Sequence, residues 1–143
     1  GTPPSGAAFI LTLAALGYNL LRHSPEIRWS ILMALIFHLT YKDAWEAARP
    51  AGEYAAPSLL EEGFIHCSKD IPQLLKVAER LYPGDLGLIV LDVDLDKLKS
   101  PLKHEPSRSG EIYPHIYGML NADAVVRERD LQLGADGAHF VAD

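Results

Sequence analysis

The chain has 143 residues, about the length of one domain, and a domain of this size buries roughly two thirds of its unfolded surface. Hydrophobic residues make up 48% of it and charged residues 22%, which excludes a disordered chain. Nineteen acidic against thirteen basic residues give a net charge of -6, which argues against general binding to nucleic acid or anionic membranes. The single cysteine, Cys67, excludes an internal disulfide and a Cys-only zinc site, and it favours a cytoplasmic location.

Residues 1–32 are set apart by an uncharged apolar run, Ala7 to Leu21, behind an opening rich in Gly, Thr, Pro and Ser. The run is too short to span a bilayer, and no Lys or Arg precedes it as in a secretory signal. We expect residues 1–32 to be an extension outside the domain, such as a start-site artefact, and residues 33–143 to form a single α+β domain. The alternative is an amphipathic helix that docks on the domain or on a partner. We expect a monomer that does not bind membranes.

The first elements of the domain are a strand and a helix. Residues 34–40, "ALIFHLT", predict a buried strand that carries His38. Thr40 and Asp43 have the spacing of a capping box, so a short helix is predicted to follow and to end before Pro50. Residues 50–60 contain two prolines and a glycine around Tyr54, which predicts a loop able to cover a cleft.

The second half is richer in strands. "GFIHCS" (63–68) predicts a short strand, and Asp70, Pro72 and Gln73 give start signals to an amphipathic helix that ends before Pro83. Residues 86–94, "LGLIVLDVD", predict a central strand; "PLKHEP" follows as a short segment, and "DAVVRERDL" and the tail predict further strands. With helices early and strands late, the fold class predicted is α+β with two short helices.

Three histidines lie in apolar or aromatic surroundings, namely His38, His66 and His115. Histidine serves as acid, base or neutral metal ligand near neutral pH, so their convergence would indicate a site. Alternatively, each is a core or turn histidine that binds a backbone carbonyl. Since neighbouring strand residues point to opposite faces, Cys67 is expected to pack inward as an inert thiol if His66 and Ser68 face a cleft. Ser68 is either a helix cap or a ligand-binding hydroxyl.

The stretch "GEIYPHIYG" (110–118) places Glu111, Tyr113 and His115 on one face of a strand. Pro114 cannot donate to a ladder, so an edge strand or an exposed bend is predicted. Glu111 there could bind a sugar hydroxyl and stabilise a developing positive charge, or the stretch is a solvent-facing edge with packed tyrosines. A catalytic zinc site of the three histidines with Glu111 is the remaining alternative, although no short metal-ligand spacing supports it.

Three stretches, "IFHLT", "EGFIHCS" and "YPHIYGMLNADAVV", together resemble the domain-of-unknown-function family 952 of bacterial and plant proteins, from about Met33 to Leu131. The resemblance implies an ADP-ribosyltransferase-like fold with a split β-sheet core and a cleft for a nicotinamide dinucleotide. It implies that His38 and Ser68 hold the ligand and that Glu111 aids transfer, with Glu105 as a second candidate carboxylate. His66 or His115 would then donate or accept the proton, and Tyr113 and Tyr117 would contact the ligand.

The function predicted is a nucleotide-type or ADP-ribose-type ligand-binding protein. Its enzymatic form would be an ADP-ribosyl- or phospho-transferase-like enzyme that uses a His/Ser/Glu cleft, with NAD as the expected cofactor. Two alternatives stay open: a non-catalytic module that binds a small molecule or a protein, and a metal-dependent hydrolase with histidine ligands.

Overall fold

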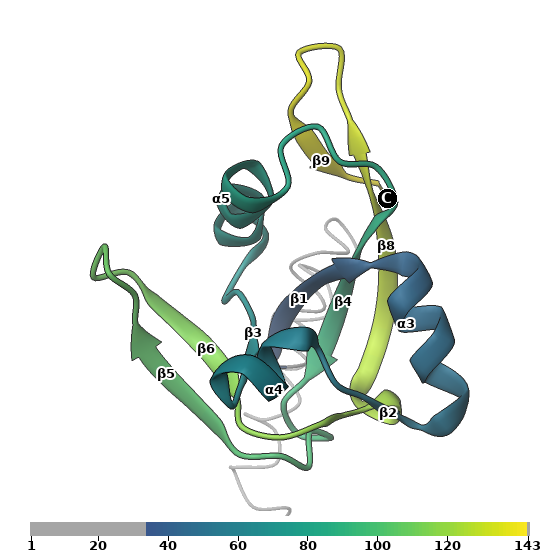
Figure 1. Cartoon of the computed structure of the whole chain (residues 1–143), viewed down its shortest axis with the longest axis vertical. Coiled ribbons are helices and arrows are strands. Elements are labelled where there is room, and N and C mark those ends of the chain that lie inside the picture. The colour runs from purple at the N-terminus through teal and green to yellow at the C-terminus, as the bar shows by residue number, and fades with distance from the viewer. Residues whose placement is uncertain (1–33, 143) are drawn as a thin grey trace, which may run out of the picture. The chain divides into compact units, whose positions relative to one another are not determined.

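The structure, a computed structural model, describes residues 34–142, and the expectations for residues 1–32 lie outside that range. Its strands are β1 (Leu35–Tyr41), β2 (Glu53–Tyr54), β3 (Ile65–His66), β4 (Leu88–Asp94), β5 (Leu102–Pro106), β6 (Ile112–Ile116), β7 (Leu120–Asn121), β8 (Val125–Leu133) and β9 (His139–Val141). The helices are α3 (Lys42–Ala48), α4 (Pro57–Glu62) and α5 (Ile71–Leu81), with 3-10 turns η1 (Arg49–Ala51) and η2 (Ala122–Ala124). The coarse prediction of an α+β fold is confirmed (Figure 1).

The larger sheet is antiparallel, with the strand order β1-β4-β8-β9. All seven residues of β4 are buried, as a strand flanked on both edges and covered on both faces requires. The prediction that residues 86–94 contain a central strand is therefore confirmed. The tail contributes β9, which pairs with β8 at the edge of this sheet, again as expected.

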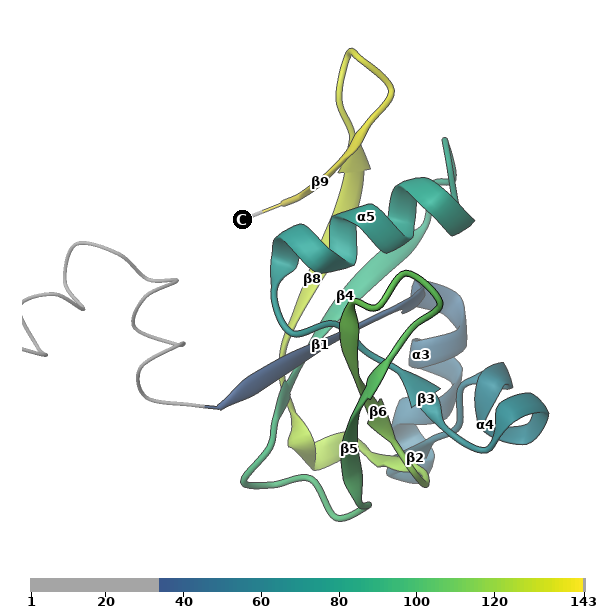
Figure 2. The ribbon, with the colours of Figure 1, turned by 90° about the vertical axis from the view of Figure 1, so that its left-hand side faces the viewer.

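The smaller sheet has the order β3-β6-β5 and is also antiparallel. A backbone bridge between Phe37 and Ser68 joins the end of β3 to β1, so the two sheets meet there. The tip of the β5–β6 hairpin lies beside α5 (Figure 2), because the Gln73 side chain donates to Glu111 and to the carbonyl of Ile112. The candidate site described below is built around this smaller sheet.

Helix α5 begins and packs as its sequence predicts. The Asp70 side chain accepts a hydrogen bond from the Gln73 amide, which is the N-cap contact, and Pro72 lies in the first turn. Its buried face places Leu74 and Ala78 in one hydrophobic cluster with Leu88 and Val90 of β4. The helix thus covers one end of the larger sheet.

The prediction of a Thr40 cap is wrong. The first helix, α3, has Tyr41 at its N-cap position and no side-chain cap. Thr40 lies within β1, and its hydroxyl is bound to that of Tyr54. A hydroxyl that binds another side chain is not available for the helix amides.

The prediction of a continuous loop over residues 50–60, and with it the two-helix count, is also wrong. This stretch contains β2 and the start of a third helix, α4. Pro57 occupies the first turn of α4, where a missing amide proton costs nothing, and Gly63 ends the helix with φ +90°. Pro57 therefore marks the start of a helix and does not mark a loop.

The prediction that the stretch 110–118 is an edge strand or an exposed bend at Pro114 is wrong as well, because β6 lies in the middle of its sheet and Pro114 is buried within it. The carbonyl of Pro114 accepts a hydrogen bond from the Cys67 amide. In an antiparallel strand the amide and carbonyl of one residue point to the same side, so the donor that Pro114 lacks falls beyond the end of β3. The short partner strand leaves room for a proline in a central position.

Candidate functional site

A group of ring side chains gathers where α4, β3 and β6 meet. Phe64 stacks on the His115 ring with centroids 4.1 Å apart, and it contacts His66 at 4.8 Å and Tyr117 at 5.3 Å. The His66 and His115 rings lie edge to face at 5.2 Å. We call Phe64, His66, His115 and Tyr117 the histidine–aromatic cluster. Two of the three candidate histidines therefore converge.

The strand register explains why these rings meet. His66 of β3 pairs with His115 of β6, and His115 pairs on its other side with Lys103 of β5. Paired residues of antiparallel strands have their side chains on one face, so the three form a row across the sheet. Tyr117 lies two residues after His115 and shares that face.

One carboxylate, Glu105, is held at the cluster by two ring side chains. It accepts a hydrogen bond from the Tyr117 hydroxyl and a second, 2.9 Å long, from Nδ1–H of His115. These bonds, that of Tyr117 first, lower the pKa of Glu105 below its usual value, and the same contact raises the pKa of Tyr117. Both bonds go to Oε1, so within residues 34–142 Oε2 has no hydrogen-bond partner and could accept from a ligand.

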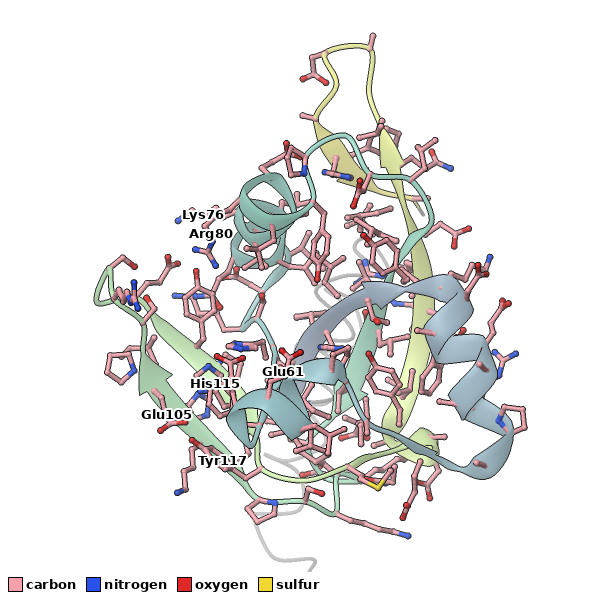
Figure 3. All side chains as sticks on the ribbon, viewed as in Figure 1. Glu61, Lys76, Arg80, Glu105, His115 and Tyr117 are labelled. Carbon is pink, nitrogen blue, oxygen red and sulfur yellow. The ribbon has the colours of Figure 1, made fainter. Side chains whose placement is uncertain are left out.

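In the Glu105–His115 pair, one ring nitrogen of His115 forms no hydrogen bond with the described residues and is available for proton transfer. Because the carboxylate can only accept, His115 donates from Nδ1, and its Nε2 has no partner among the residues that the structure describes. The His115 side chain is 11% exposed and that of Glu105 35% exposed. A carboxylate that orients an imidazole in this way is the arrangement of a general base or acid. Figure 3 shows Glu105, His115 and Tyr117 together on the hairpin.

A second carboxylate–histidine pair lies at the open side of the cluster. Glu62, the last residue of α4, lies 2.6 Å from His66 Nε2, which donates to it. The His66 side chain is 52% exposed, so this pair is in contact with solvent. Sequence reasoning missed both Glu62 and Phe64, although their spacing was a usable signal: Glu62 precedes His66 by four residues and Phe64 precedes it by two.

His38, the third candidate histidine, lies in the interior. It is 4% exposed; Nδ1–H donates to the carbonyl of His66 at 2.7 Å, and Nε2 accepts from the Tyr54 hydroxyl at 3.2 Å. Tyr54 in turn accepts from Thr40 at 2.8 Å, so the chain of bonds is complete with a neutral imidazole. Burial lowers the pKa of His38 to about 4, against the effect of the bond to His66. His38 therefore reaches the cluster only through the backbone of His66.

The two residues that follow His66 are both buried. Burial raises the pKa of the Cys67 thiol, in keeping with the expectation of an inert, inward-facing cysteine. Ser68 is also buried, although strand alternation placed it on the face of His66. The strand β3 ends at His66, and Ser68 pairs with Phe37 of β1 instead, so the alternation does not extend to it.

Glu111 lies at the far end of β6 from the cluster. Its Oε1 accepts from Gln73 at 3.1 Å and its Oε2 from the Tyr113 hydroxyl at 3.2 Å, and the bond from Gln73 is the main cause that lowers the pKa of Glu111. It lies four positions before His115 in the sequence, about 13 Å away at the usual rise of a strand. Glu105, and not Glu111, is thus the carboxylate beside the histidines.

Two further ionic groups lie away from the cluster. Asp92, fully buried in β4, is bound by Arg127 and Arg129 of β8 at 2.8 Å each, and Glu79 of α5 binds the ring and the backbone amide of His139. Each group joins neighbouring elements, and in the first of them Arg129 Nε is buried without a hydrogen-bond partner among the described residues. Between Ala34 and Ala142, no group of three or more His, Cys, Asp or Glu residues is placed to hold a metal ion. The zinc alternative therefore has no ligand set in this part of the chain.

A model of the family described as a protein of unknown function, DUF952, matches residues 39–128. The chain belongs to the DUF952 family. Every residue of the histidine–aromatic cluster, together with Glu62 and Glu105, lies within the matched range.

The solved structures similar to this DUF952 chain include those of protein CC0527 from Caulobacter crescentus. Its crystal structure is 36% identical, covers 74% of this chain and 93% of that chain, and superposes with a TM-score of 0.67. Its solution NMR structure is 36% identical, with 74% and 91% coverage and a TM-score of 0.64. No curated protein matches the chain. These comparisons establish the family and the fold and do not assign an activity.

The structure also bears on the membrane prediction. In the part of the chain that it describes, no helix is both long enough and apolar enough to cross a bilayer.

Proposed function

We propose that this DUF952 protein binds a nicotinamide dinucleotide at the histidine–aromatic cluster and transfers its ADP-ribosyl group. The observation that carries the proposal is the placement of Glu105, a carboxylate fixed by Tyr117 and His115 with one oxygen open, beside a set of stacked rings. The ADP-ribosyltransferase-like fold that the sequence resemblance to DUF952 implies is in keeping with the same ligand class.

The cluster suits a flat, positively charged ring. Phe64, His66 and Tyr117 are partly or largely exposed, so each offers ring surface for stacking. Two carboxylates, Glu62 and Glu105, lie beside them, and one cation, Lys103, lies 4.6 Å from the centre of the Tyr117 ring. The oxidised nicotinamide ring carries a positive charge, which aromatic faces and nearby carboxylates both attract. A neutral ring gains only the stacking.

The proposed reaction uses the cluster as a site for a sugar cation. The bond between the anomeric carbon and the nicotinamide nitrogen breaks, and its electron pair leaves with nicotinamide. Positive charge then develops on the ribose, where Glu105 Oε2 stabilises it through space. An acceptor hydroxyl forms the new bond to the anomeric carbon, and its proton passes to Nε2 of His115.

In this proposal His38 positions the site and does not touch the ligand. Its Nδ1–H holds the carbonyl of His66, which fixes the strand that carries the His66 ring. Ser68 and Glu111 have no part in the chemistry, because the first is buried and the second is bound to Gln73 and Tyr113 away from the cluster. Glu105 takes the role that the family resemblance suggested for Glu111.

The experiment compares binding and turnover in one series. Calorimetric titration with the oxidised and the reduced dinucleotide measures the preference for the charged ring, and chromatography measures nicotinamide release with and without an added hydroxyl acceptor. We expect tighter binding of the oxidised form and a fall in release of about 100-fold or more in Glu105→Gln. Glu46→Gln on α3, an exposed glutamate outside the cluster, is the matched control.

The outcomes separate the proposal from its alternatives. Binding without release in the wild type supports the non-catalytic binding module. Equal release by Glu105→Gln and Glu46→Gln contradicts the role of Glu105. The absence of binding to either dinucleotide at millimolar concentration contradicts the ligand class.

A further inference from the structure

Helix α5 carries a pair of cations one turn apart, Lys76 and Arg80, that project from its outer side (Figure 3). Both are exposed, and residues four apart on a helix lie on the same face. In a chain with a net charge of -6, two adjacent exposed cations are a distinct local feature, although Lys76 forms an ion pair with Glu111.

The acids near this pair are already bound to other groups. Glu111 lies 3.6 Å from Lys76, but its two oxygens accept from Gln73 and Tyr113. Glu79 accepts from the backbone amide and the ring of His139. Across residues 34–142, Arg80 forms no ion pair or hydrogen bond with another side chain. The positive charge of the pair is therefore only partly neutralised.

The pair also borders space for a ligand. A shallow surface hollow of about 720 Å³ is lined by the charged side chains of Lys76, Arg80 and Glu79, by His139, and by the apolar side chains of Pro72, Leu75 and Ala138. Cations beside apolar surface suit a molecule that joins phosphate groups to a nucleoside.

One strand connects this helix to the histidine–aromatic cluster. Lys76 contacts Glu111 just before β6, and His115 lies on the same face of β6 about 13 Å further along. In a dinucleotide one ribose lies between the nicotinamide ring and the diphosphate, which is shorter than that separation, so the long side chains of Lys76 and Arg80 have to reach toward the cluster. We propose that Lys76 and Arg80 bind the diphosphate of the ligand whose nicotinamide end lies at the cluster, with the adenosine half in the hollow. This inference rests on the proposed function for the nicotinamide end only.

The test uses three probes on the full chain: oxidised dinucleotide, ADP, and nicotinamide riboside, which has no phosphate. The variant Lys76→Gln with Arg80→Gln is compared with Lys97→Gln and Lys99→Gln, which removes the same charge from the exposed turn after β4. Titration calorimetry is run at low and moderate salt. We expect the α5 variant to weaken ADP and the dinucleotide about tenfold or more, to flatten their salt dependence, and to leave the riboside unchanged.

Each outcome decides between the two proposals. If the riboside binds and the α5 variant leaves ADP and dinucleotide affinity equal to those of the turn variant, the diphosphate assignment is overturned and the cluster proposal stands. If ADP binding depends on the α5 pair while the riboside does not bind, the phosphate site stands and the cluster proposal fails. If no probe binds, both fail.

Discussion

Two histidine environments lie close to each other in this molecule and differ in almost every physical respect. His38 is buried, neutral, and bonded at both ring nitrogens to Tyr54 and to the carbonyl of His66. His115 is held by one carboxylate, stacks on Phe64 and keeps Nε2 without a partner among the described residues. The difference teaches that a histidine with both nitrogens satisfied supports structure, while one with an oriented and open nitrogen can act on a ligand.

The largest expected effect is on stability at the buried histidine. Replacing His38 by Ala leaves the Tyr54 hydroxyl and the His66 carbonyl without a partner and opens a cavity. We expect a loss of about 2–4 kcal/mol in the free energy of unfolding, measured by urea denaturation. His104→Ala, at an exposed position of β5, is the control and should match the wild type. Equal stability of the two variants would show that the His38 network is not structural.

The next largest expected effect is the pH dependence of stability that arises from the protonation of His38. Its folded pKa, about 4, lies below the usual 6.5, so the unfolded chain binds the proton more readily and stability falls as pH decreases from 6.5 toward 4. Between pH 7.5 and pH 5 the loss from this group is about 2 kcal/mol. Urea denaturation of wild type and His38→Gln at both pH values measures it. The glutamine variant should lose less over this range, and parallel losses would contradict a buried neutral imidazole.

Removal of the Tyr54 hydroxyl is expected to reduce the free energy of unfolding by a smaller amount. In Tyr54→Phe, His38 Nε2 and the Thr40 hydroxyl both lose their partner in a buried place, and we expect a loss of about 1–2 kcal/mol. Tyr41→Phe removes the same atom at an exposed position, where water replaces the contact with Asp85. Thermal denaturation of the two variants is the measurement. A loss that is as large at Tyr41 as at Tyr54 would remove the contrast between buried and open sites.

The smallest effect on stability is expected at the open pair of the cluster. Glu62→Gln removes the charge that faces His66 at a solvent-exposed position, and exposed ion pairs contribute little to folding. We expect unfolding like that of the wild type but weaker binding of the oxidised dinucleotide, measured by titration calorimetry beside Glu46→Gln. A clear loss of stability with unchanged binding would reverse the role that we propose for this pair.

The sequence predicted the elements whose pattern is local. The apolar run of β4 and the periodicity and cap of α5 were readable because burial and the Asp70 contact depend on neighbours in the chain. Three other features were not predicted from the sequence. Thr40 binds Tyr54 in place of a helix, Pro57 starts a helix inside an apparent loop, and Pro114 is tolerated in a central strand because β3 is short.

Part of the candidate site could be predicted from the sequence. The register of β3 and β6 brings His66 and His115 together, while Ser68 and His38 turn inward and Glu111 lies with α5. Glu105 could be named only as a second candidate, because its bond to His115 depends on the pairing of β5 with β6, which sequence alone does not give. Phe64 and Glu62 were missed since their role exists only once the rings are stacked.

The most direct test of the central claim is an NMR titration of the histidine side chains with the oxidised dinucleotide. Ring resonances of protein labelled at histidine are assigned with single His→Gln variants, and their shifts are followed up to millimolar ligand. The account predicts that His66 and His115 shift together with one saturation curve, while His38 moves little. Shifts confined to His38, or no shift at His115 at saturation, would contradict it.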